Sequence, residues 1–149
     1  MEIWIRNDRP EAGIDEERLR NRLKSALGAS GCDEDTELSI WLCSDEDIRE
    51  LHRVYFGRDT PTNVISFSQR EGEFADPDTP VLGDVVVSLD TAFREAEGAG
   101  WAPDDMVFYL CLHGVLHLLG YDHEGDQAHR AAEMEARQEE LFEAIAREA

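Results

Sequence analysis

The segment at residues 110–123, LCLHGVLHLLGYDH, limits the folds and activities open to this chain more than any other part of it. It contains three of the five histidines, His113, His117 and His123, in an H-x3-H-x5-H spacing. Three protein nitrogens around one zinc ion, with the fourth position left to water, are typical of catalytic rather than structural sites. We therefore expect these histidines to bind one Zn2+ per chain and to act in catalysis through it. The alternative is that the three histidines are unrelated, one in a core and two near a helix end. Their clustering disfavours this alternative.

The local structure of this segment follows from its apolar character. Residues 107–119 are nearly all apolar, a run too long for an ordinary strand, and Pro103 followed by two aspartates is typical of a first helical turn. In a helix, His113 and His117 lie one turn apart on one face, as a shared metal requires. Gly120 is expected to end this helix in a left-handed conformation, and the resulting reversal can bring the third histidine to the same point.

The residues between and beside the histidines refine the prediction. Asp122 is expected to accept a hydrogen bond from a metal-bound imidazole rather than to bind the metal, because such imidazoles usually donate their second N–H group to a carboxylate or carbonyl. Cys111, about 200° round the helix from His113, is expected in the core. Metzincin peptidases share the histidine spacing but carry a glutamate directly after the first histidine as general base. Here that position is Gly114, which disfavours a peptidase.

The string HGVLHLLGYDH resembles the signature of the YbeY family, bacterial metal-dependent endoribonucleases that mature ribosomal RNA. TNVISF at residues 62–67 and LGDVVVS at residues 82–88 resemble other blocks of that family, in the same order. The resemblance covers roughly residues 51–123. Many members have Tyr-Arg before the first of these blocks, whereas this chain has Tyr55-Phe56. An arginine often assigned a role in RNA cleavage is therefore absent, and Arg58 is the nearest substitute.

The resemblance implies a zinc-dependent, single-strand-specific endoribonuclease that acts in ribosomal RNA maturation, notably at the small-subunit 3′ end, and in ribosome quality control. Its partners would be ribosomal RNA precursors and the ribosome or its small subunit, with neither DNA nor a membrane, and the chain is expected to be a cytoplasmic monomer. Two alternatives remain open. One is a metallohydrolase on a small or peptidic substrate, which a carboxylate from Asp84 or Asp122 near the metal would favour. The other is a non-catalytic ribosome-assembly factor with structural zinc, which an unfolded apo protein would favour.

Length and composition agree with one domain. At 149 residues and 42% hydrophobic content, the chain is long enough for one core, so residues 1–149 are expected to form a single metal-dependent endoribonuclease domain of the YbeY-like kind. Its first residues lack the basic and apolar regions of a secretory signal. Three widely spaced cysteines are typical of reduced thiols in a reducing compartment.

The net charge of −20, from 14 basic and 34 acidic residues, is opposite in sign to that of most nucleic-acid-binding proteins. It indicates either a solubilising surface or an affinity for RNA that depends on a local basic patch or on a partner. We expect Arg58, Arg70 and Arg94 to lie nearest the cleft. Asn63 and Ser66 are further candidates for lining it.

The expected element order, β-α-β-α-β-β-α-α-α, predicts an α+β fold: a single mixed β-sheet packed against a central metal-binding helix and flanking helices. The strand from Asn63, or the one after Gly83, is expected to border the cleft. Residues 69–80 are expected to form a loop, either a solvated connector or a flap over the site. Gly28 is expected to end the first helix. His52 and His129 are expected to be surface or capping residues. Inward-facing positions are also expected at Ile48, Leu51 and Tyr55 of the second helix and at Ala131, Met134, Leu141 and Ile145 of the last.

Overall fold

The computed structural model describes residues 1–70, 76, 78–121 and 127–147. The third histidine, His123, and Asp122 lie outside the described residues, as does half of the segment expected to be a loop. The strands are β1 (Glu2–Asn7), β2 (Glu37–Cys43), β3 (Val64–Ser68) and β4 (Val81–Ser88). The helices are α1 (Glu16–Ala29), α2 (Asp45–Phe56), α3 (Leu89–Ala99), α4 (Pro103–Leu118) and α5 (Gln127–Ala146), with a short 3-10 helix, η1 (Pro10–Ala12). No helix in these ranges is long and apolar enough to cross a membrane.

The sheet is mixed, as expected, with the strand order β1-β2-β4-β3. β1, β2 and β4 are parallel, whereas β3 pairs antiparallel with β4 and forms one edge. The β2–β4 register shifts between Glu37, opposite Val81, and Leu38, opposite Gly83. Gly83 has a φ of +152°, and a Cβ there would lie 2.3 Å from the Phe67 carbonyl oxygen, so this irregular pairing requires glycine.

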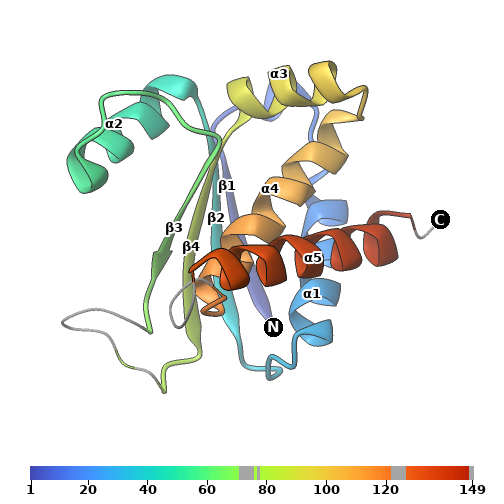
Figure 1. Ribbon diagram of the computed structural model, residues 1–149. Helices are drawn as coiled ribbons and strands as arrows, with labels where there is room; N and C mark the ends of the chain where they lie inside the picture. Colours follow the sequence, from blue (N-terminus) through green and yellow to red (C-terminus); the bar gives the residue numbers. More distant parts are fainter. Residues whose placement is uncertain (71–75, 77, 122–126, 148–149) are drawn as a thin grey trace.

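The helices cover the two faces of the sheet unequally. α1, α3, α4 and α5 lie on one side and α2 on the other (Figure 1). α4 is the central helix: it contacts β3, β4 and the other three helices of its layer, and ten of its sixteen residues are buried. This burial explains why its sequence is apolar nearly all round. The structure therefore confirms the α+β fold with the histidine-bearing helix at its centre.

Three details differ from the sequence-based expectations. α1 continues past Gly28 to Ala29, and the left-handed residue after it is Gly31, with a φ of +81°. Tyr55 is 64% exposed, with its ring edge-on to Phe67, because α2 buries only Ile48 in its first turn. Ala131 is exposed and lines a cavity, and Met134 is the first buried residue of α5 within the described part of its surface.

Candidate metal centre

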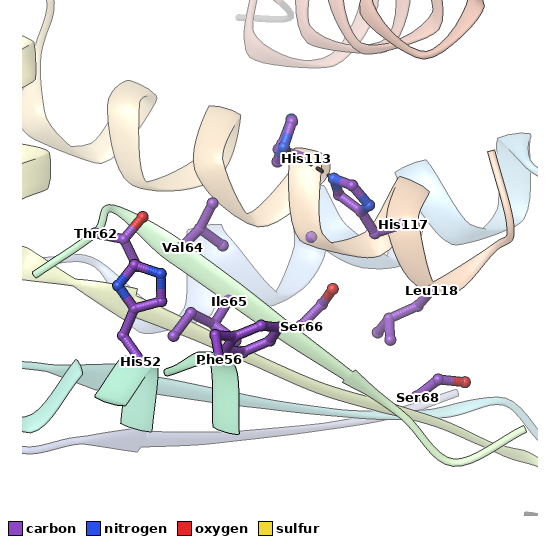
Figure 2. Close-up of a pocket in the computed structure, with 11 residues that line it drawn as sticks. His52, Phe56, Thr62, Val64, Ile65, Ser66, Ser68, His113, His117 and Leu118 are labelled. Atoms are coloured by element: carbon purple, nitrogen blue, oxygen red, sulfur yellow. Dashed lines mark hydrogen bonds between the residues drawn. The ribbon is translucent and has the colours of Figure 1, made fainter. Parts of the chain in front are cut away.

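The first two predicted ligands lie together on α4. The Nε2 atoms of His113 and His117 are 3.1 Å apart, and both rings are partly exposed to a cavity (Figure 2). Two imidazole nitrogens at zinc-ligand distance from one tetrahedral ion would lie about 3.3 Å apart. The spacing of this pair and its donor type therefore fit a zinc site.

Gln138 of α5 holds the first of these rings. Its Nε2 donates to the Tyr109 carbonyl at 3.0 Å, which turns its Oε1 toward Nδ1 of His113, 3.2 Å away. An amide oxygen can only accept, so Nδ1 carries the hydrogen and Nε2 keeps its lone pair toward His117. Only 4% of Gln138 is exposed. Sequence reasoning assigned the orienting role to Asp122 and missed Gln138, although a polar residue four after Met134 on a buried stripe was a signal.

The turn after α4 has the predicted form. Gly120 has a φ of +90°, and its N–H donates to the His117 carbonyl at 3.0 Å. The N–H of Tyr121 donates to the Leu116 carbonyl at 3.2 Å, which completes a Schellman motif. The chain therefore reverses just before His123. Among the residues that the structure describes, no group of three or more His, Cys, Asp or Glu residues could hold a metal. The structure thus brings together two of the three predicted ligands, His113 and His117.

Packing explains the glycine between the two histidines. A Cβ at Gly114 would lie 2.6 Å from Cγ1 and 3.0 Å from Cγ2 of Val85, which is fully buried on β4. A glutamate at this position has no room, which agrees with the argument against a metzincin-type peptidase. Cys111 is fully buried, as expected, and burial raises the pKa of its thiol to about 12.

The histidine pair opens into a cavity of about 400 Å3 at the β3 edge of the sheet. Its walls come from α2, β3 and α4 (Figure 2). Ser66 lines it, as expected, and so does His52, which sequence reasoning placed on the surface. Nδ1 of His52 donates to the Thr60 carbonyl at 2.7 Å, so its Nε2 is the nitrogen left for other partners. The described lining residues are His52, Phe56, Thr62, Val64, Ile65, Ser66, Ser68, His113, Gly114, His117 and Leu118.

A second cavity, of about 680 Å3, adjoins the same two histidines between β3 and the helices α3, α4 and α5. Asn63 lines it, and its Nδ2 donates to Oε1 of Glu95 at 3.1 Å. Glu135 and Gln138 also contribute to its wall. The histidine pair thus lies between a cavity without carboxylates in its described lining and one with two.

Several charged candidates lie elsewhere. Asp84 lines a hollow on the opposite face of the sheet and accepts from Gln69 at 3.4 Å, so it is not the carboxylate near the metal that sequence reasoning considered. Arg94 pairs with Asp45 at 2.7 Å, and Arg70 donates to a backbone carbonyl. Within the described lining of the two cavities, neither arginine appears. Arg58 lies two residues after the end of α2, and it too is absent from the described lining of both cavities.

Comparisons with known proteins bear on the family and the fold of the chain. A family model described as Endoribonuclease YbeY matches residues 4–146. A protein with that description from Geobacter sulfurreducens is 46% identical over 142 residues, covering 95% of this chain and 94% of its own length. One from Syntrophus aciditrophicus is 43% identical, covering 95% and 88%. The solution structure of a Thermotoga maritima protein has a similar fold, with a TM-score of 0.66 and 24% identity over 96% of this chain and 88% of that one.

Proposed function

Since this chain belongs to the YbeY family of endoribonucleases, and is thus a hydrolase that acts on RNA, we propose that it cleaves single-stranded ribosomal RNA precursors with one bound zinc ion. His113, His117 and His123 are the proposed ligands. The observation that supports this most directly is the 3.1 Å spacing of the first two Nε2 atoms beside an open cavity. We propose that the enzyme is a monomer in the cytoplasm and that its partner is the ribosome or its small subunit. A main cleavage site would be the 3′ end of small-subunit RNA, and ribosome quality control would be a further role.

When bound, zinc would act as a Lewis acid toward the phosphodiester and lower the pKa of water. The remaining work falls to the chain itself. Gln138 keeps the Nε2 lone pair of His113 directed at the site, and the Schellman turn at Gly120 ends α4 just after His117. Val85 excludes any side chain at Gly114. These contacts fix the ligands before a substrate arrives, which is how preorganised sites lower a barrier.

The specificity for single strands is supported by the position of the cavity. It lies at the edge strand β3, between α2 on one face of the sheet and α4 on the other, a position that suits an unpaired strand with its bases accessible. Sequence-specific proteins generally read RNA through such unpaired segments. The net charge of −20 opposes tight binding of free RNA and favours delivery of the substrate by a partner such as the ribosome.

The proposal is tested by incubating the zinc-loaded protein with matched single-stranded and duplex RNA, with and without a chelator. We expect cleavage of the single strand alone, loss of cleavage with chelator and its return on adding zinc. His117→Ala should be inactive, whereas His129→Ala, which removes an exposed imidazole paired with Glu133, should be unaffected. Cleavage that survives chelation, or equal cleavage of the duplex, contradicts the proposal. Casein hydrolysis that disappears in His117→Ala would favour a peptidase instead.

A further inference from the structure

The cavity beside the histidine pair is bounded by an exposed aromatic ring on the side of α2. Phe56, the last residue of that helix, lines the cavity and is 53% exposed. The centroid of its ring lies 5.9 Å from that of His52 and 6.3 Å from that of Phe67. Both neighbours are tilted against it, at 56° and 40°. Neither therefore stacks in parallel on Phe56, which leaves the ring able to accept a planar partner.

The cavity offers stacking and hydrogen bonds rather than ion pairs. Its described lining includes the hydroxyl-bearing residues Thr62, Ser66 and Ser68 but no Lys, Arg, Asp or Glu. Phosphate contacts by Lys and Arg normally supply much of the affinity for RNA, and this lining provides none. A base stacked on an aromatic ring needs no phosphate neutralisation, and every base has a face that can stack.

We propose that Phe56 is a stacking platform for one nucleobase of single-stranded RNA, close to the phosphodiester that is cleaved. The inference rests on the proposed function, because it assumes that the strand passes the histidine pair. Figure 2 shows Phe56 and His52 on the α2 side of the cavity, His113 and His117 on the α4 side, and the β3 residues between them. A base on Phe56 thus shares one cavity with the proposed metal ligands. Phe56 is a positioning residue: it fixes the strand and does not act on the reacting atoms.

The first test measures steady-state cleavage of a short single-stranded RNA by zinc-loaded variants. Phe56→Ala should raise KM about 5- to 100-fold, with kcat little changed, because stacking contributes equally to ground-state and transition-state binding. Phe56→Leu, which keeps an apolar side chain without a ring, should show a similar rise, and Phe56→Trp should keep the wild-type KM. Tyr55→Ala is the matched control. Its ring is 64% exposed but lines the hollow on the opposite face of the sheet, so KM should not change.

The second test removes the base instead of the ring. One abasic nucleotide is moved along the RNA, and at one position near the cleaved bond it should weaken binding to the wild type by the factor seen for Phe56→Ala. The same abasic RNA should lose nothing further with Phe56→Ala, because the two changes remove one interaction. The salt dependence of binding should be unchanged in Phe56→Ala, whereas Arg58→Ala should reduce its log-log slope by about 0.7 if Arg58 contacts a phosphate.

The outcomes separate the two proposals. A Phe56→Ala enzyme with the wild-type KM, an equal effect of Tyr55→Ala, or abasic and Phe56→Ala effects that simply add would overturn the stacking platform and leave the proposed function intact. A wild-type enzyme whose cleavage of RNA survives chelation would overturn the proposed function instead. Denaturant unfolding of Phe56→Leu and Phe56→Ala distinguishes a lost contact from a lost fold.

Discussion

Gly114 lies where α4 comes closest to the sheet. Replacing it with alanine adds a Cβ 2.6 Å from Cγ1 of Val85 and 3.4 Å from Cγ2 of Val64. We expect the free energy of unfolding to fall by about 1 to 3 kcal/mol from this overpacking, despite a gain of up to about 1 kcal/mol in helix propensity. Urea unfolding measures both this variant and Gly28→Ala, a control in α1 with nothing within 4 Å of the added Cβ. The control should be more stable by about 0.5 to 1 kcal/mol. If Gly114→Ala matches it, the close approach of helix and sheet is wrong.

Gln138 is the residue whose loss should weaken metal binding without removing a ligand. In Gln138→Leu the buried acceptor for His113 Nδ1 disappears, and zinc affinity should fall about 10- to 100-fold, as for other residues that orient metal ligands. Competition with a chromophoric chelator measures this. Tyr109→Phe is the control, because it removes a different α4–α5 contact, the 2.5 Å hydrogen bond to Glu139. Equal affinities in Gln138→Leu and wild type would show that His113 needs no such support.

The residues of the candidate site differ in how far the sequence predicts them. His113 and His117 are predictable because helical periodicity alone places positions four apart on one face. Gln138 and His52 belong to other helices, and only tertiary packing brings them to the site. Sequence reasoning placed His52 at the surface or at a cap and gave Gln138 no role. Phe56 was recognised only as a departure from the family pattern, and its exposure to the cavity came from the structure.

Among the elements, α2 depends on a polar cluster at its first residue. Oδ1 of Asp45 accepts from the Ser88 and Thr91 hydroxyls, each at 2.6 Å, and Oδ2 accepts from Arg94 at 2.7 Å. Burial raises the pKa of Asp45, but these hydrogen bonds and the Arg94 charge together lower it below the usual 3.8. Because the pKa is lower in the folded state, the stabilisation is complete well above pH 3.8 and is lost as the pH falls through the folded-state pKa.

Asp45→Asn should therefore lower the free energy of unfolding by about 1 to 3 kcal/mol at neutral pH. The difference from wild type should shrink as the pH falls below 3.8, the ordinary pKa of the carboxyl group. Urea unfolding across a pH series measures it, with the exposed Asp35→Asn as control. A difference that stays constant down to pH 2 would show that the charge of Asp45 does not stabilise the attachment of α2.

Element types were more predictable than their ends. The expected element order contained all five helices, and at the start of α2 the Ser44 side chain accepts from the Asp47 N–H. The prediction that Gly28 ends α1 was wrong because the sequence does not distinguish Gly28 from Gly31, and only Gly31 adopts a positive φ. β4 begins at Val81 and not after Gly83 as expected, because the strand continues through this glycine although it interrupts the apolar run.

At the scale of the molecule, the order of the strands was beyond the sequence. β4 pairs with β2 and β3 at once, and this arrangement creates the edge at which the cavity lies. The same packing pairs arginines with carboxylates of the chain itself. Arg9 binds Asp90, and Arg22, 7% exposed, binds Asp105. The described lining of the two cavities contains no arginine or lysine, so we expect the RNA affinity to depend on stacking and on a partner rather than on charge.

The zinc content of the purified protein tests the central claim most directly. Elemental analysis of the wild type should give about one zinc per chain, since three histidines with an open fourth position suit that ion. His113→Ala, His117→Ala and His123→Ala should each bind much less while remaining folded, and His129→Ala should retain the wild-type content. Full zinc occupancy in folded His113→Ala and His117→Ala proteins would place the metal elsewhere and contradict the account.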